Sequence, residues 1–437
     1  MKSIEQETSP VQWGKRLRTP PKVIAALCSI SAGLLLNEQL CNNVIPLSLR
    51  HFTTDAGLIG LILAIHPAFG VLVQPVVGIL GDRIWTRVGR RATFLVVCAP
   101  AAAICLALIA HAPGFWSYLA LLVLFQFFFA ALWGSDHPLI AELAPAAQRP
   151  LVKGGMLACG QISSFFFVTY GVGRAMDRWG EPSVYWIVAA GQILLVAVAA
   201  FFLGESRVTP APRPKLTPAR YVRDLWGDAM LRRFAVLGFA YAAFVASVMG
   251  FAVLFAVRTL GLSRADFGGA WGSQCLLAIV CAIPIGLAVT RVPKQWALVA
   301  GFICALLACL IALRSDAGRW IYPIALLFGT GVLTIDVTLP SFFSEYLPRD
   351  IIGQLTGAYN ICYAAGRIVA LIGTGWVVAA AHGDYRVIWM VAIGFGVLGA
   401  IVAATIPDRR WHGSMGRPAS PGQRIVSRPI AVPVGNG

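Results

Sequence analysis

Charge is scarce in this sequence, and that scarcity limits the kind of protein it can encode. Of its 437 residues only 12% are charged, while 58% are hydrophobic. About a quarter of the residues in an ordinary soluble domain are charged. The composition therefore excludes an ordinary soluble protein and indicates a chain that lies largely within a lipid bilayer.

Several familiar signals are also absent. No Gly-rich loop ending in Gly-Lys-Ser or Gly-Lys-Thr occurs, so we expect no ATP hydrolysis. Residues 1–20 are polar and lead into no short apolar core with a cleavage site, so no removable signal peptide is expected. The ten cysteines lie in apolar runs without metal-type spacing, which argues against disulfides and zinc. No nucleophile is paired with a base in the chain, so we predict no enzyme, no cofactor and no metal.

Long apolar runs, by contrast, recur along the whole chain. Each is about 20 residues long, which is the length that spans the hydrocarbon core as a helix. They predict an all-α membrane protein with twelve transmembrane helices, at residues 22–47, 56–80, 92–111, 115–140, 153–173, 183–204, 233–257, 266–290, 295–313, 319–342, 354–379 and 385–406.

The net charge of +16 is explained by the distribution of the Lys and Arg residues along the chain. With the amino terminus inside, most Lys and Arg residues fall in inner loops and in the tail, which is the positive-inside pattern. We therefore expect a bacterial inner-membrane protein with both termini in the cytoplasm. The lipid bilayer is its expected partner, and nucleic acid is not needed to explain the basic excess.

The longest internal polar segment separates two halves of six spans. Thr217 followed by Pro218 within it is typical of a helix start and predicts a short helix on the inner membrane surface. The predicted organisation is a cytoplasmic N-terminal segment, a six-helix bundle, a linker, a second six-helix bundle and a basic, disordered cytoplasmic tail, at residues 1–21, 22–204, 205–232, 233–406 and 407–437.

The halves repeat in sequence at a shift of about 203 residues. AELAPAAQRPLVKGG mirrors SEYLPRDIIGQLTG, which pairs Glu142 with Glu345 and Pro145 with Pro348. Such parallel repeats are typical of transporters with two pseudo-symmetric bundles and a site between them. Chance similarity of two apolar helices is the alternative, and the shared Glu-x-x-Pro argues against it.

The segment GILGDRIWTRVGRR joins the second and third predicted spans. Its acid can pair with arginines, and an ion cluster that forms in one state and separates in another would act as a gate latch. The alternative is that the arginines only fix the topology. The predicted gate residues are Gly78, Asp82, Arg83, Arg87, Gly89, Arg90, Arg91, Glu142 and Glu345.

This segment resembles the major facilitator superfamily, in which Gly-x-x-x-Asp-Arg and then Gly-Arg-Arg or Gly-Arg-Lys join spans two and three. The extra IWTRV, together with NNVIPLSL, QPVVGILGDR and HPLIAELAP, is similar to the branch of plant sucrose carriers and of glycoside, pentoside and hexuronide cation symporters. The resemblance covers spans one to five well and the second half more loosely. It implies the major facilitator fold and a cation-coupled sugar carrier.

The sequence departs from that branch at several positions. Gly81 precedes Asp82 where the branch often has Ser, and Ala92 follows Arg91 where a basic residue or Pro is frequent. Gln126 stands where plant sucrose carriers place an acid in span four. The resemblance therefore does not imply that Gln126 takes part in proton coupling.

Polar groups inside the predicted spans are the candidates for a substrate site, because a charge at mid-helix costs about 2.5 to 3.5 kcal/mol on insertion scales. Glu38 and Asn42 share one helix face, and Glu38 is the first candidate for the coupling proton; simple solvation at the outer helix end is the alternative. Arg367 is the only basic residue deep in a span. Asp336 on the preceding span is its expected partner, as a structural ion pair or as one that loosens for substrate or proton.

Other polar residues complete the candidate site. His66, beside Pro67, can bind a ligand or be satisfied by a neighbouring carbonyl. Trp133 and Asp136 form either an inner-gate group or an interfacial helix end. Amide and aromatic side chains would supply a hydrogen-bonding ring. The full predicted substrate and coupling set is Asn37, Glu38, Asn42, His66, Gln126, Trp133, Asp136, Gln161, Tyr241, Gln274, Asp336, Asn360, Tyr363 and Arg367.

These features predict a monomeric secondary active transporter of a small polar solute, such as a sugar. Because no ATP-binding motif is present, an ion or solute gradient must drive it. Its expected coupling ion is H⁺. Two alternatives stay open: a proton-driven exporter of amphipathic compounds, and a non-transporting membrane assembly factor with the same fold.

Overall fold

The computed structural model describes residues 19–83, 86, 92–144, 148–202, 227–346 and 352–408. Within these ranges the regular structure is entirely helical. Twelve helices, several of them broken, are long and apolar enough to cross a membrane. The prediction of an all-α protein with twelve spans is confirmed.

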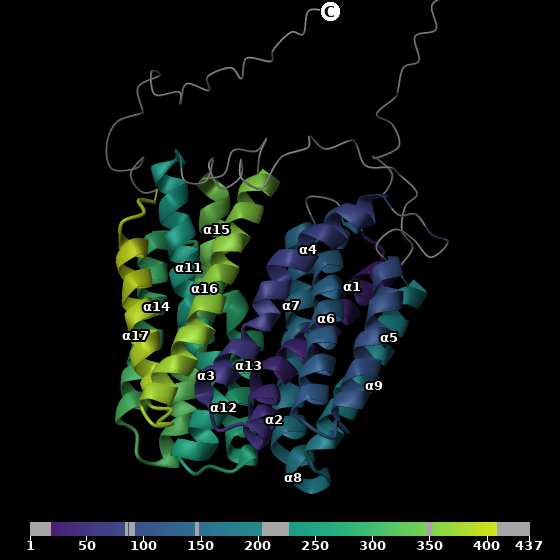
Figure 1. The fold of residues 1–437 in the computed structure, drawn as a ribbon. Coiled ribbons are helices and arrows are strands. Elements are labelled where there is room, and N and C mark those ends of the chain that lie inside the picture. Colours follow the sequence, from purple (N-terminus) through teal and green to yellow (C-terminus); the bar gives the residue numbers. More distant parts are fainter. Residues whose placement is uncertain are drawn as a thin grey trace, which may run out of the picture.

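The first six spans form one bundle, most of which lies on the right in Figure 1, while its helix α3 lies against α16 of the other bundle. Its helices are α1 (Pro21–Asn43), α2 (Ile45–Phe52), α3 (Ala56–Leu63), α4 (Ile65–Arg83), α5 (Ala92–Ile109), α6 (Phe115–Leu143), α7 (Arg149–Phe166), η2 (Phe167–Ala175), α8 (Met176–Trp179) and α9 (Glu181–Phe202).

The last six spans form the second bundle, on the left in Figure 1. Its helices are α11 (Ala229–Met249), α12 (Ala252–Leu254), η3 (Phe255–Thr259), α13 (Arg264–Val289), α14 (Lys294–Arg314), η4 (Gly318–Trp320), α15 (Ile321–Tyr346), α16 (Ile352–Ala380) and α17 (Val387–Ala404).

Helices α1 and α17 place both ends of the described core on one side of the molecule, which we call the terminal face (Figure 1). The opposite side, the hairpin face, carries the short turns around Thr53, Gly180, Gly261 and Gly383. The predicted linker helix near Thr217 and the predicted basic tail lie outside the described residues.

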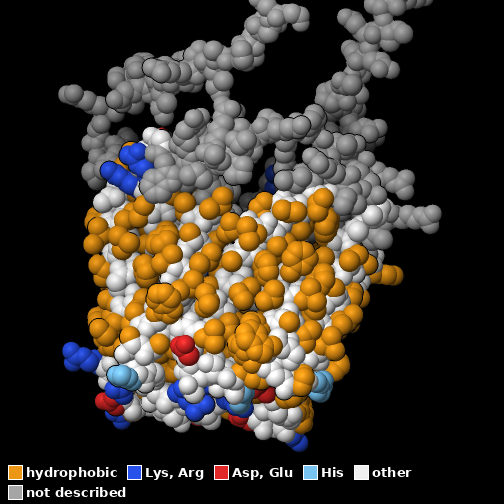
Figure 2. All heavy atoms as spheres, viewed as in Figure 1, with side chains coloured by type: hydrophobic (Ala, Val, Ile, Leu, Met, Phe, Trp, Pro, Cys, Tyr) orange, Lys and Arg blue, Asp and Glu red, His pale blue; other side chains and the backbone are white. Residues whose placement is uncertain are grey.

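The outer surface between these two faces suits a bilayer. Figure 2 shows a broad band of hydrophobic side chains around the middle of the molecule, with charged side chains gathered toward the hairpin face and at one corner of the terminal face. Large apolar residues such as Leu72, Leu194 and Ile283 are among the exposed residues of the spans. Lipid would cover this surface, because a contiguous apolar band of this size is not stable in water.

Proline breaks the second span at the depth where its polar residue lies. Pro67 has no backbone N–H and cannot bond to the carbonyl of Leu63, so the helix is interrupted between α3 and α4. Ala64 caps α3, and His66 stands in the first turn of α4. The break therefore sets the direction in which the His66 side chain points from the span.

The two bundles touch closely toward the hairpin face, and glycine makes the contact possible. An added Cβ at Gly60 of α3 would lie 2.3 Å from the carbonyl oxygen of Leu371 in α16, and one at Gly375 would lie 2.5 Å from that of Ala56. At a second contact near the same face, one at Gly268 of α13 would lie 2.6 Å from the carbonyl oxygen of Val168 in η2. Small residues let the backbones approach, as in other membrane helix pairs.

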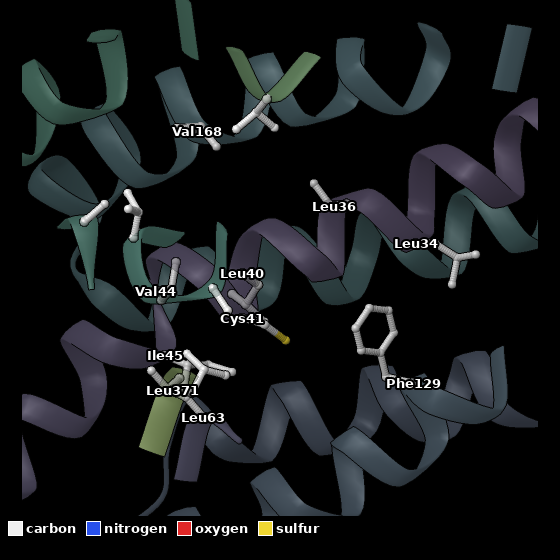
Figure 3. Packing of buried hydrophobic residues seen from close by; sticks show 14 of the residues in the cluster. Leu34, Leu36, Leu40, Cys41, Val44, Ile45, Leu63, Phe129, Val168 and Leu371 are labelled. Carbon is white, nitrogen blue, oxygen red and sulfur yellow. The ribbon is translucent and has the colours of Figure 1, made fainter. Parts of the chain in front are cut away.

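Apolar side chains seal the same end of the interface. Leu63 and Leu371 come from different bundles and lie together with Ile45 in Figure 3. A Cβ at Gly250 of the second bundle would lie 2.5 Å from Leu371 and 3.6 Å from Leu63. The hairpin side of the inter-bundle interface is therefore tightly packed.

Candidate functional site

An ion pair joins the two bundles directly beside this apolar seal. The Arg367 guanidinium of α16 donates to Glu38 Oε1 of α1 over 2.9 Å. The Glu38 side chain is 16% exposed and that of Arg367 25% exposed, so both charges are largely removed from solvent. Such a pair is favourable only when each charge has a close partner, and here each bundle supplies one of the two charges.

His66 holds the other oxygen of the same carboxylate. Its Nε2 lies 2.9 Å from Glu38 Oε2, and its Nδ1 lies 2.9 Å from Gln126 Oε1. The imidazole also stacks on Phe129, with ring centroids 5.1 Å apart. Gln126 in turn donates to Cys41 Sγ over 3.4 Å. Four spans thus meet in one polar network inside the bilayer.

A small cavity lies against this network. Its volume is about 20 Å³, which is enough for about one water molecule. The lining includes Asn42, His66, Gln126 and Arg367. The predicted convergence of these four residues is therefore seen in the structure, although in this conformation the space beside them is smaller than a sugar.

The expected pairing of Arg367 with Asp336 is wrong. Arg367 binds Glu38, and Asp336 accepts a hydrogen bond from the Tyr241 hydroxyl over 2.6 Å. The two acids come from different bundles, and the sequence alone could not show which of them lies closer to the guanidinium. The same geometry argues against the alternative that Glu38 is simply solvated at the outer end of its helix, because its side chain is largely buried between the bundles.

Two tyrosines among the candidates of the second bundle lie near Asp336. Tyr363 lies within electrostatic range of both Asp336 and the pair of Glu38 with Arg367. Its ring centroid is 6.4 Å from that of Tyr241. Asn360, one turn earlier in α16, is exposed. Asp336 is exposed too, although it lies in the second half of a spanning helix.

Other predicted residues lie away from the network. Asn37 is fully buried and donates to the carbonyl of Gly33 in its own helix. Gln274 packs on Gly329 inside the second bundle. Gln161 is half-buried on α7. We therefore exclude Asn37 and Gln274 from the group that the structure brings together.

Two residues were predicted late in span four. Trp133 is half-buried and makes an edge contact with Phe129, one turn from the His66 stack. The side chain of Asp136 lies outside the described part of the structure. Both alternatives for Trp133 and Asp136, an inner-gate group and an interfacial helix end, therefore stay predictions.

Most of the predicted gate also falls outside the described side chains. This holds for Asp82, Arg83, Arg87, Arg90, Arg91 and Glu142, and for the backbone of Gly89; Gly78 lies within α4. Glu345 is described, and it accepts a 2.7 Å hydrogen bond from Lys294 Nζ at the terminal face. The backbone N–H of Lys294 also donates to Asp408. These contacts tie the terminal ends of α14, α15 and α17 together.

We expect Glu345→Gln to lower the free energy of unfolding by about 1 to 3 kcal/mol, because Lys294 is only 8% exposed and would lose a charged partner. Asp316→Asn is the matched control. Its ion pair with Arg386 is largely exposed and should contribute about 0 to 1 kcal/mol. Thermal unfolding of the purified variants checks this, and equal losses in both would contradict it.

A polar cluster near the hairpin face was missed in the sequence. Ser48 of α2 donates to Glu181, and its hydroxyl lies 2.6 Å from that of Tyr185 in α9. Tyr118 extends the chain at 3.0 Å from Tyr185, and His51 contacts Glu181 at 2.8 Å. The cluster joins three spans of one bundle. Its members come from scattered segments, so no local pattern could have found it.

Comparisons with known proteins agree with this architecture. The family model described as Major Facilitator Superfamily matches residues 27–371. No curated protein matches the sequence. A crystal structure of a bacterial homologue of the human lysosomal transporter Spinster, inward-facing and unoccupied, has a TM-score of 0.69 and 17% identity, and covers 91% of this chain and 99% of that chain. A crystal structure of the nucleoside transporter NupG has a TM-score of 0.67 and 14% identity, and covers 88% and 98%. At these identities the likeness shows the fold.

Proposed function

This chain belongs to the major facilitator superfamily, and on that premise we propose that it is a secondary active transporter of a small polar solute, coupled to protons. The family is one of transporters, not of enzymes. The observation that carries the proposal is the buried ion pair of Glu38 with Arg367, which is shared between the bundles and held by His66.

The pair suits alternating access, in which the bundles rock around a site at mid-depth. While Glu38 is ionised, it attracts Arg367 and helps to hold the bundles together. Protonation removes that attraction, and the guanidinium and the amides of Asn42 and Gln126 become available to a solute. A proton and a solute would then move in the same cycle.

The packing supports a site that opens toward the terminal face. The hairpin side is closed by Gly60, Gly268 and Gly375, each within backbone distance of the other bundle. The Spinster homologue of similar fold is inward-facing. With the positive-inside pattern of the sequence, this supports a terminal face in the cytoplasm of a bacterial cell and solute release on that side.

The solute class rests on the polar lining and on the resemblance to sugar-carrier sequences. Amides, a guanidinium and tyrosines are suited to hydroxyl groups and to a sugar ring. The nucleoside transporter of similar fold is named for a sugar-containing solute. We therefore favour a sugar or sugar-like solute and a monomeric carrier.

A non-transporting assembly factor of the same fold is the second candidate. The small size of the cavity beside Arg367 favours it, because a carrier must at some point admit its solute. A proton-driven exporter of amphipathic compounds would need an apolar chamber, whereas the described cavity combines Leu63 and Leu371 with the polar side chains of Asn42, His66, Gln126 and Arg367.

Uptake into proteoliposomes tests the proposal. We expect an inward proton gradient to drive accumulation of at least one labelled sugar or nucleoside. Glu38→Gln should abolish the response to the gradient, since an amide carries no exchangeable carboxyl proton, while equilibrium exchange of the solute persists. The exposed variant Asp316→Asn should behave as the unmodified protein. Gradient-driven uptake that survives in Glu38→Gln would remove Glu38 from this role, and no uptake of any solute would favour the assembly factor.

A further inference from the structure

The second acid of the interior, Asp336, has no cationic partner among the described residues. Its one described polar contact is the 2.6 Å hydrogen bond from Tyr241. Arg367 is engaged by Glu38. An ionised carboxylate without a cationic partner is costly at this depth, so the carboxylate of Asp336 is suited to receive a positive charge.

The contacts of Asp336 place it near the inter-bundle site. Its partner Tyr241 is only 2% exposed. Tyr363 interacts electrostatically both with Asp336 and with the pair of Glu38 and Arg367. These contacts place the Asp336 carboxylate beside the polar groups of the bundle interface.

Three tyrosines lie near the same carboxylate. Tyr241, Tyr359 and Tyr363 all interact electrostatically with Asp336. Consecutive ring centroids, from Tyr241 to Tyr363 and from Tyr363 to Tyr359, are 6.4 Å apart. Tyr359 is fixed by stacking on Phe343 at 4.6 Å. Aromatic faces next to a carboxylate are the arrangement by which proteins hold ammonium groups.

We infer that Asp336, Tyr241, Tyr359 and Tyr363 form a subsite for a positively charged amine, so that the solute is a small hydroxylated amine. Its ammonium group would lie against Asp336 and the tyrosine rings, and its hydroxyl groups would face the amides of the first bundle. The inference rests on the proposed carrier function for its place in the cycle, but binding at the subsite can be measured separately.

The test uses the purified full-length protein and two pairs of compounds that differ only by an amine in place of a hydroxyl: glucosamine with glucose, and ethanolamine with ethylene glycol. We expect the amine of at least one pair to bind at least about tenfold more tightly in calorimetric titrations. Asp336→Asn keeps an acceptor for Tyr241 and should remove this preference. The exposed control Asp316→Asn should retain it.

Each outcome decides one question. No preference in either pair, including no binding at all, overturns the subsite, as does a preference that survives Asp336→Asn. Thermal unfolding of Asp336→Asn shows whether the variant is folded. An amine preference that Asp336→Asn removes, without proton-driven uptake, keeps the subsite and refutes the carrier. Proton-driven uptake of neutral sugars without an amine preference keeps the carrier and refutes the subsite.

Discussion

Arg367→Gln is expected to lower the free energy of unfolding by about 3 to 5 kcal/mol, which is the usual cost of leaving one buried charge without its partner. Glu38 would keep His66 as its one ionisable neighbour but lose the charge that the second bundle supplies. The loss should be smaller at pH 5 than at pH 8, because a proton can then neutralise the stranded carboxylate.

The double variant Glu38→Gln with Arg367→Gln separates this cause from a general packing effect. Two neutral amides can hydrogen-bond across the same distance, so the double variant should recover most of the lost stability. Thermal unfolding in one detergent, with all four proteins of the cycle, measures the coupling. Additive losses in the two single variants would mean that the residues do not interact.

Gly375→Ala is expected to separate the bundles at the hairpin side. The added methyl group would lie 2.5 Å from the Ala56 carbonyl oxygen and 3.1 Å from Gly60 Cα, both backbone atoms that cannot turn away. Overpacking of this kind costs about 1 to 3 kcal/mol. Because the cost falls on the state closed at the hairpin face, uptake should fall by about tenfold for each 1.4 kcal/mol.

Gly373→Ala supplies a matched control on the same helix. No atom outside its own helix lies within 4 Å of the Cβ position at Gly373. Replacing a helical glycine by alanine there should raise stability by up to about 1 kcal/mol and leave uptake unchanged. If both variants transport alike, the close approach of α3 and α16 does not limit the cycle.

The spans could be predicted from the sequence because each depends on local composition. Long apolar runs and their polar separators give twelve helices whatever their packing. The spacing of Glu38 and Asn42 likewise placed them on one face of one helix. These are short-range properties, so the sequence carries them directly.

Contacts between spans could not be predicted in the same way. Glu38 and Arg367 are 329 residues apart, and nothing along the chain distinguishes Glu38 from Asp336 as the partner of Arg367. The repeat does hold one signal for a contact between spans, which concerns Lys294. Lys294, the partner of Glu345, follows Arg91 by the same shift of about 203 residues that relates Glu345 to Glu142.

The proton-dependent link between the bundles is tested most directly by distances at the hairpin face. Spin labels at Thr54 and Asp384, one on each bundle, would be measured in a functional cysteine-replaced protein by pulsed electron resonance at pH 5 and pH 8. We expect the distance distribution to shift between the two pH values, and the shift to vanish in Glu38→Gln. Identical distributions at both pH values, or an unchanged shift in Glu38→Gln, would contradict the account.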